Sequence, residues 1–110
     1  MIHHNVRRAL QVIECRYSEP DLCLAHVARD ARVSVYHLSR VIKLVTGRGF
    51  VAHVHARRTA RARKLLAFSK LSIKEIASVV GYRSVTQLDR HYRRAYGVTP
   101  SATRRSLFPS

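Results

Sequence analysis

Arginine recurs at matching places in two similar segments of the chain, as Arg40 and Arg90. A guanidinium group there can donate two hydrogen bonds to the O6 and N7 atoms of guanine. The second segment also holds Gln87, whose amide can pair with N6 and N7 of adenine, and Asp89, whose carboxylate can accept from N4 of cytosine. These side chains can contact the edges of DNA bases, provided that helices present them to solvent.

The similarity between the two segments extends well beyond the arginines. The first copy contains Leu24, Val27, Ala28, Ala31, Val33, Ser34, Leu38, Arg40, Ile42 and Gly47, and the second contains Ile73, Ile76, Ala77, Val80, Tyr82, Ser84, Leu88, Arg90, Tyr92 and Gly97. Their offset is 49 residues as far as Val33 and 50 from Ser34 onward, so the second turn carries one extra residue. Two apolar helical stretches separated by a short turn, present twice, predict a pair of helix-turn-helix units.

Apolar residues recur at helical spacing throughout, which predicts an all-α protein without strands. Helices are expected at residues 4–17, 24–31, 35–46, 50–67, 73–80, 85–95 and 101–107. Residues 1–110 then form one domain of two helix-turn-helix lobes, at 4–47 and 68–107. The linker helix at 50–67 joins the lobes and would be about 27 Å long.

Residues at the expected helix ends support these boundaries. Ser34 and Ser84 can each cap a following helix, whereas the thiol of Cys23 accepts hydrogen bonds weakly. Ser72 and Glu75 have the spacing of a capping box. Glycines suited to helix ends and turns follow at Gly47, Gly81 and Gly97.

The same periodicity predicts which side chains face the interior and which face solvent. The expected interior residues include Val6, Leu10, Ile13, Tyr17, Leu24, Val27, Ala28, Ala31, Leu38, Ile42, Val45, Phe50, Val51, Val54, Ala62, Leu65, Leu66, Leu88 and Tyr92. The expected DNA-binding residues on the opposite faces are Val35, Tyr36, Ser39, Arg40, Lys43, Val85, Thr86, Gln87, Asp89, Arg90, Arg93 and Arg94.

Each of these surface residues also has a plainer interpretation. Arg40 and Arg90 can instead face solvent or phosphate, and Asp89 can form an i,i+4 ion pair with Arg93. Val35 and Val85 are as well explained by exposure as by contact with thymine methyl groups. Lys43 and Arg94 fit phosphates, as do Arg48, Arg83 and Arg104. The basic cluster at 57–64 is either a solvated helix face or a further phosphate contact.

Composition favours a polyanionic partner. The chain has 21 Lys and Arg residues against 6 Asp and Glu residues, a formal net charge of +15. No apolar run approaches the roughly 20 residues that span a bilayer, so we expect no membrane partner. No nucleophile stands with a base and no carboxylate pair is evident, so we expect no enzyme activity. Cys15, Cys23 and His26 lack a fourth ligand at zinc spacing, so we expect free, buried or half-buried thiols and no metal or other cofactor.

Several stretches resemble the DNA-binding domain of the AraC/XylS transcription regulators. They are Tyr17-Ser18-Glu19-Pro20, Leu24-x-x-Val27-Ala28, Leu38-Ser39-Arg40, Thr46-Gly47, Ala62-Arg63-Lys64-Leu65-Leu66, Leu71-Ser72-Ile73-x-Glu75-Ile76-Ala77, Gly81-Tyr82 and Tyr96-Gly97-Val98-Thr99-Pro100-Ser101. The resemblance implies seven helices, with the helices at 35–46 and 85–95 entering successive major grooves of bacterial promoter DNA. It further implies a cytoplasmic activator that recruits RNA polymerase. Two recognition helices held by a linker helix of about 27 Å predict that a monomer binds a non-palindromic site of about 20 bp.

The chain departs from the pattern of that family at four positions. Arg32 stands where the family usually has glycine in the first turn, which implies a strained positive φ at this residue. The family usually has serine or threonine at Cys23, an aliphatic residue at Thr59 and serine or threonine at Asp89. The first three departures bear on stability and the fourth on specificity.

Two other functions remain open from the residues alone. A non-specific architectural protein would be held by charge, but paired recognition helices with distinct exposed residues argue against it. An RNA binder would expose aromatic residues on a sheet, and no sheet is expected. The chain has no room for a sensor domain, so we expect either a stand-alone regulator or the C-terminal piece of a longer one.

Overall fold

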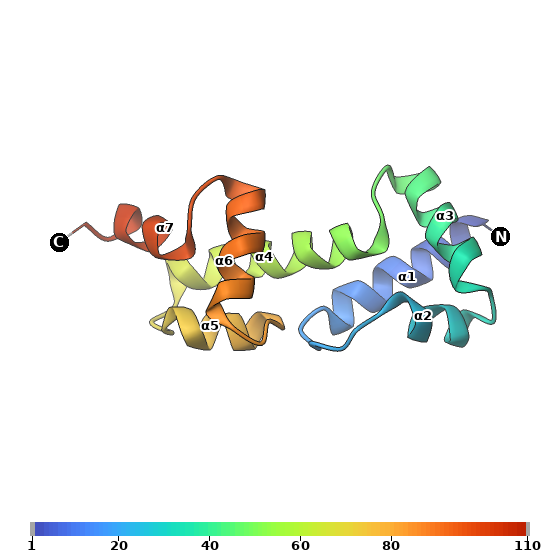
Figure 1. Cartoon of the computed structure of the whole chain (residues 1–110), viewed down its shortest axis with the longest axis horizontal. Helices are drawn as coiled ribbons and strands as arrows, with labels where there is room; N and C mark the ends of the chain where they lie inside the picture. Colours follow the sequence, from blue (N-terminus) through green and yellow to red (C-terminus); the bar gives the residue numbers. More distant parts are fainter. Residues whose placement is uncertain (1, 110) are drawn as a thin grey trace. The chain divides into compact units, whose positions relative to one another are not determined.

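The computed structural model describes residues 2–109, and within that range it consists of seven α-helices connected by short turns (Figure 1). Met1 and Ser110, at the ends of the expected domain, lie outside the described residues. The chain divides into two compact units. Unit 1 comprises the described residues up to Tyr17 together with Asp21–Arg57, and unit 2 comprises Ser18–Pro20 and the described residues from Arg58 onward.

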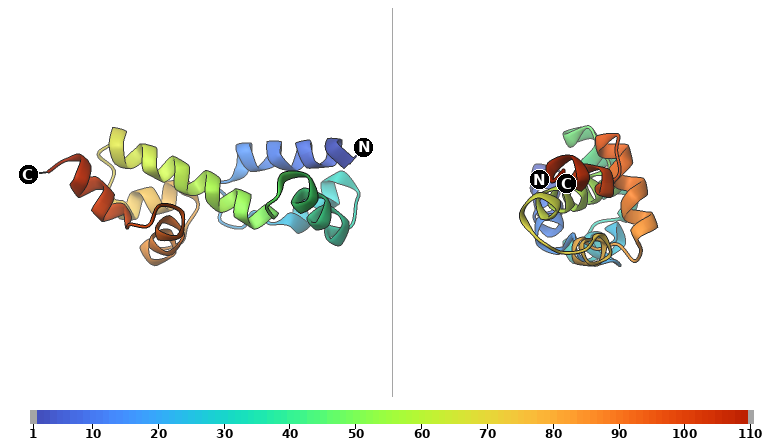
Figure 2. Two further views of the ribbon diagram at one scale, coloured as in Figure 1. Left: turned by 90° about the horizontal axis from the view of Figure 1, so that it is seen from above. Right: turned by 90° about the vertical axis from the view of Figure 1, so that its left-hand side faces the viewer.

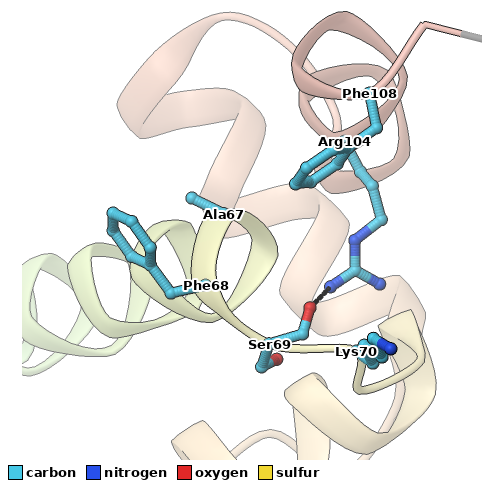
Figure 3. Close-up of a pocket in the computed structure, with 6 residues that line it drawn as sticks. All are labelled: Ala67, Phe68, Ser69, Lys70, Arg104 and Phe108. Atoms are coloured by element: carbon cyan, nitrogen blue, oxygen red, sulfur yellow. Dashed lines mark hydrogen bonds between the residues drawn. The ribbon is translucent and has the colours of Figure 1, made fainter.

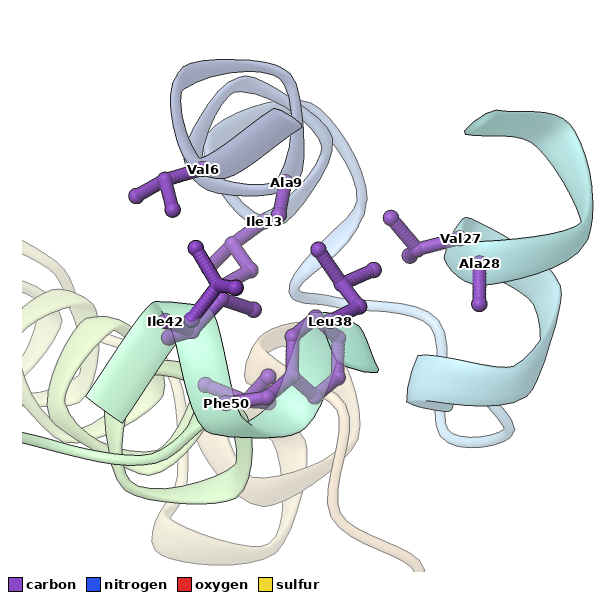
Figure 4. Packing of buried hydrophobic residues seen from close by; sticks show 10 residues of the cluster. Val6, Ala9, Ile13, Val27, Ala28, Leu38, Ile42 and Phe50 are labelled. Carbon is purple, nitrogen blue, oxygen red and sulfur yellow. The ribbon is translucent and has the colours of Figure 1, made fainter. Parts of the chain in front are cut away.

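Unit 1 is built from α1 (Ile2–Arg16), α2 (Leu24–Ala31), α3 (Val35–Thr46) and the first part of α4 (Phe50–Phe68). Its core brings together side chains from all four helices (Figure 4). They are Val6, Ala9 and Ile13 of α1, Val27 and Ala28 of α2, Leu38, Val41 and Ile42 of α3, and Phe50 and Val54 of α4. The expected apolar faces of these helices are therefore the ones that pack.

Two residues expected in this core are exposed instead. Val45 is 42% exposed and lines a surface hollow beside Leu10, while Val41 takes the buried place. Val51 is 64% exposed because it lies one residue, and thus about 100° around the helix, from the buried Phe50. The prediction was wrong for both valines, since each lies near the end of a helix where the apolar stripe is short.

Unit 2 is built from the rest of α4 with α5 (Ile73–Val80), α6 (Val85–Tyr96) and α7 (Pro100–Leu107), seen from two further sides in Figure 2. Its buried cluster consists of Ala62, Leu66, Ile76, Ala77, Val80, Tyr82, Leu88 and Tyr92. The hydroxyl groups of Tyr92 and Thr103 are 3.0 Å apart, which links α6 to α7. Leu65 is only half-buried, whereas the expected burial of Leu88 and Tyr92 is confirmed.

The helix ends follow the capping residues. The hydroxyl groups of Ser34 and Ser84 accept from the third backbone N–H of their helices, at 3.0 and 3.2 Å. Ser72 and Glu75 form a complete capping box, and hydrogen bonds from Ser72 to the Glu75 carboxylate lower the pKa of that carboxyl group. Cys23 makes no side-chain cap to α2, as expected for a thiol.

Both cysteines are free thiols, as expected. Cys23 is half-buried, but Cys15 is exposed, so the expectation that both thiols are shielded was wrong for Cys15. Cys15 lies on α1 outside the stripe formed by Val6, Ala9 and Ile13, which is the face that packs. None of the helices within residues 2–109 has the length and apolar character needed to span a membrane.

Arg32 ends α2 in the left-handed region, with φ 58° and ψ 40°. Its backbone N–H donates to the carbonyl groups of Ala28 and Arg29, so the residue is the C-terminal cap of the helix. Arg32 is the one non-glycine residue at positive φ among residues 2–109. The positive φ implied at this turn is confirmed, and a side chain bearing a Cβ atom is strained there.

Replacing Arg32 by glycine is therefore expected to raise the free energy of unfolding by about 1 kcal/mol, less the entropy that glycine adds to the unfolded chain. Thermal unfolding followed by circular dichroism measures the gain. If the strain is tolerated because Arg32 contacts a phosphate, the variant will also bind DNA more weakly. The slope of log K against log salt concentration will then be shallower by about 0.9. A variant that melts lower would contradict the strain argument.

Candidate nucleic-acid interface

The face of α3 opposite its core residues carries the first set of expected DNA-binding residues. All five are exposed: Val35, Tyr36, Ser39, Arg40 and Lys43. Leu38, Val41 and Ile42 hold the other face in the core of unit 1. Tyr36 is 74% exposed, and the guanidinium of Arg40 lies 5.8 Å from the centre of its ring. A tyrosine and an arginine one turn apart thus form a joint polar and aromatic surface.

The face of α6 carries the second set, but its exposure is less uniform. Thr86, Arg90, Arg93 and Arg94 are exposed, while Val85, Gln87 and Asp89 are half-buried. Val85 lines a hollow beside Pro20 and Tyr82, so its side chain is partly covered by unit 2 itself. Among the described residues no ion pair joins Asp89 to Arg93, which leaves the Asp89 carboxylate available as an acceptor.

Gln87 is fixed by two hydrogen bonds at the start of α6. Its side-chain Oε1 accepts from the backbone N–H of Arg83 at 3.0 Å. Its own backbone N–H donates to the hydroxyl group of Ser84 at 3.2 Å. The pairing with adenine expected for this amide uses Oε1 as an acceptor, and one of the two lone pairs of that atom is already engaged.

Behind α6 lies a stack of three side chains that holds the helix in place. The rings of Tyr82 and His91 are parallel within 5°, with centroids 5.4 Å apart. The guanidinium of Arg58 lies 5.2 Å from the centre of the Tyr82 ring. Burial raises the pKa of the Tyr82 hydroxyl to about 12. Burial lowers the pKa of His91, and the charges of Arg90 and Arg94 add to this, so the imidazole stacks in its neutral form.

Arginines of the basic cluster at 57–64 bind the protein itself. Arg58 is only 6% exposed and donates to the carbonyl oxygen of Glu19 at 2.9 Å. Arg57 donates through Nε to both carboxylate oxygens of Glu14, each at 2.9 Å, and its guanidinium lies 4.7 Å from the centre of the Tyr17 ring.

Arg63 of the same cluster lies 4.8 Å from the centre of the Tyr96 ring. Arg57 and Arg58 are thus held by the protein itself, which neither expected role describes, whereas Arg63 is exposed and fits the solvated helix face, although it also stacks on a tyrosine. The sequence could not reveal these stacking contacts, because each arginine and its tyrosine lie far apart along the chain.

Arg104, expected at a phosphate, is instead turned inward at the end of α4 (Figure 3). Its guanidinium donates to the carbonyl oxygens of Leu65, Leu66, Ser69 and Leu71. The carbonyls of Leu66, Ser69 and Leu71 lie in the last turn of α4 and the segment after it, where carbonyls lack helical partners, while that of Leu65 also accepts from the backbone N–H and the hydroxyl of Ser69. Arg104 therefore caps α4 and ties α7 to it.

His53 of unit 1 is paired within the protein. The Nε2 atom of His53 is 2.8 Å from the hydroxyl of Thr46, and burial lowers the pKa of its imidazole, with the charge of Arg48 adding to this. Within residues 2–109 no group of three or more histidine, cysteine, aspartate or glutamate side chains could hold a metal ion. The exposed faces of α3 and α6 are thus the candidate interface.

Comparison with known proteins identifies this arrangement. A family model described as a helix-turn-helix domain matches residues 27–106. The C-terminal domain of AraT, a response regulator from Geobacillus stearothermophilus, has a TM-score of 0.91 at 38% identity, covering 96% of this chain and 88% of that one. The chain belongs to the AraC/XylS family. The all-α fold with two helix-turn-helix lobes joined by a long helix is confirmed.

Two further members place this AraC/XylS chain among DNA-binding domains. The DNA-binding domain of AdpA, solved in complex with a target DNA, has a TM-score of 0.80 at 28% identity and covers 99% of this chain and 96% of that one. Regulatory protein PocR of Salmonella typhimurium is 35% identical over 102 residues, which are 93% of this chain and 33% of PocR. The chain is thus similar over nearly its whole length to a domain that binds double-stranded DNA, and it spans about a third of the length of PocR.

Proposed function

We propose that this AraC/XylS domain reads promoter DNA through both of its helix-turn-helix units, with α3 and α6 in two successive major grooves. The observation that carries the proposal is the equivalence of the two helices. Each has 12 residues, begins after a capping serine, and presents an arginine from the face opposite its core. A helix fits the major groove, and residues of its first turns reach the base edges.

The charge of the chain supports the same proposal. A net charge of +15 supplies the sequence-independent attraction to phosphates. The side chains on α3 and α6 differ, since Tyr36 and Ser39 face solvent on one and Thr86 and Asp89 lie on the other. A purely architectural protein has no need of two different sets of base-reading groups. Sequence-specific binding therefore explains more of the surface than charge alone.

The role in transcription follows from the relatives. PocR is described as a regulatory protein and AdpA as a global transcriptional factor with a target DNA. By this likeness we infer that the chain is the DNA-binding part of a cytoplasmic regulator that binds DNA as a monomer and works with RNA polymerase. The expected DNA-binding residues of α3 and α6, Arg93 included, would then serve as base and phosphate contacts.

A footprint tests the proposal directly. We expect one chain to protect a non-palindromic site of about 20 bp, because two major grooves on one face of DNA lie about 34 Å apart. Selection of duplexes from a randomised pool, followed by hydroxyl-radical footprinting, measures the site. Mass measurement of the complex gives the stoichiometry.

A control distinguishes specific from charge-driven binding. Raising the salt concentration weakens binding of the chain to all duplexes, but the ratio of its affinities for the selected and the scrambled duplex should persist. Two chains on a palindrome shorter than one helical turn would contradict the monomeric mode. Equal affinity for the selected and scrambled duplexes would favour the architectural alternative.

A further inference from the structure

The carboxamide of Gln87 is held in one orientation. Its Oε1 atom accepts a hydrogen bond of 3.0 Å from the backbone N–H of Arg83. A backbone N–H can only donate, so the atom that faces it must be the amide oxygen rather than the nitrogen. Because the oxygen points back toward Arg83, the Nε2 atom lies on the other side of the carboxamide.

The fixed orientation changes what Gln87 offers to a base. An unrestrained glutamine presents an acceptor and a donor together, which is the pair that adenine requires. With Oε1 turned toward the Arg83 N–H, the oxygen is drawn away from a paired contact with one base, and the NH₂ group on the other side of the carboxamide has two donors and no acceptor. In the major groove guanine shows two acceptors, N7 and O6, whereas cytosine shows only a donor. A donor group is thus matched to guanine and opposed to cytosine.

We propose that the hydrogen bond from Arg83 makes Gln87 read its base through its NH₂ donors, which selects guanine and rejects cytosine at one position of the bound DNA. The inference rests on the proposed function, in which the first turn of α6 enters a major groove. Gln87 is the third residue of α6 and is half-buried, so part of its side chain remains accessible to solvent. Residues in that turn are the ones that reach base edges.

The substitution Gln87→Glu reverses the outward group with little change of shape. One carboxylate oxygen can accept from the Arg83 N–H as Oε1 does, and the other then faces the groove as an acceptor. An outward acceptor matches the N4 donor of cytosine. The hydrogen bond at the start of α6 is kept, so the variant alters chemistry rather than position.

Selection from a duplex pool randomised at every position of the site compares the full chain with its Gln87→Glu variant. We expect the preferred base at one position to change from guanine to cytosine. The ratio of the affinities for the two bases there should change by about 2- to 10-fold, which is the range that one hydrogen bond supports. All other positions should keep their preferences. The added negative charge repels phosphates on every duplex alike, so ratios within one protein are unaffected by it.

Two controls make the result specific to the side chain. Gln87→Met keeps the length of the side chain and removes its donors and acceptor, so the preference at that position should vanish. Asp89→Asn exchanges an acid for an amide two residues further along the same helix, and it should alter a different position. Circular dichroism establishes that each variant is folded.

The possible outcomes separate this inference from the proposed function. If the wild type selects a clear sequence but Gln87→Glu keeps guanine at the same position, Gln87 only caps α6 and the inference is overturned. If Gln87→Glu does not fold, a Gln87→Met variant that keeps the guanine preference overturns it equally. If the wild type selects no sequence, the proposed function fails, and the inference fails with it.

Discussion

Replacing Arg104 by alanine is expected to lower the free energy of unfolding by about 2–3 kcal/mol. The guanidinium donates to four backbone carbonyl groups, at Leu65, Leu66, Ser69 and Leu71. Hydrogen bonds from a charged group are stronger than neutral ones, and the alanine variant leaves the part-buried carbonyls of Leu66, Ser69 and Leu71 without this donor, while that of Leu65 keeps Ser69. The loss falls on unit 2, where α7 would no longer be tied to the end of α4.

Thermal unfolding by circular dichroism measures the change, with each kcal/mol lowering the melting temperature by about 4–8 °C. The matched control is Arg105→Ala, which removes the same charge from the next residue of α7. Arg105 is exposed, so its loss should change stability by no more than about 0.5 kcal/mol. Equal effects of the two substitutions would show that charge, not capping, accounts for the contribution of Arg104.

Arg104→Lys separates the charge from the shape of the side chain. Lysine keeps the positive charge but lacks the planar fork that reaches several carbonyl groups at once. We expect a stability between those of the wild type and the alanine variant. A fully stable lysine variant would mean that one point charge near the end of α4 is sufficient.

The helices themselves could be predicted closely because the chain marks their ends. The predicted side-chain caps form at Ser34, before α3, and at Ser72, before α5, where Glu75 in the first turn completes the capping box. Apolar residues one helical turn apart, such as Leu88 and Tyr92, then identify the buried face. Both signals are local, so they can be read from the sequence without knowing what packs against each helix.

The sequence around each arginine does not indicate whether its side chain is exposed or turned inward. The same side chain can lie in solvent or turn inward, and only the partner decides which. Arg58 is buried on Tyr82, and Arg104 reaches back to α4 from more than thirty residues further along the chain. A cluster of positive charge in the sequence was therefore a poor guide to which arginines face solvent.

The candidate site depended on the same distinction. Arg40 and Arg90 could be assigned to exposed faces because Leu38 and Leu88, two residues before each, take the core. The orientation of Gln87 could not be foreseen, since it depends on where the N–H group of Arg83 points after the turn. Helix periodicity thus predicts which face a residue occupies, while the chemistry it offers there depends on the turn geometry.

The double substitution Arg40→Ala with Arg90→Ala is expected to remove most of the preference for the selected DNA site. Each arginine that pairs with guanine contributes about 1–3 kcal/mol of discrimination. The two residues lie in different units, so their effects should add to about 2–6 kcal/mol, roughly 30-fold to 10⁴-fold in relative affinity. Binding to a scrambled duplex should fall far less.

The matched control is Lys43→Ala with Arg94→Ala, which removes the same charge from the same two helices. If Lys43 and Arg94 contact phosphate, this control should weaken binding to every duplex alike and make the salt dependence shallower by about 0.9 for each contact. The single variants Arg40→Ala and Arg90→Ala should each relax one base position, in different halves of the site. If the double variant lost as much affinity for scrambled DNA as for the selected site, both arginines would be phosphate contacts. Base recognition would then have to come from other residues of α3 and α6.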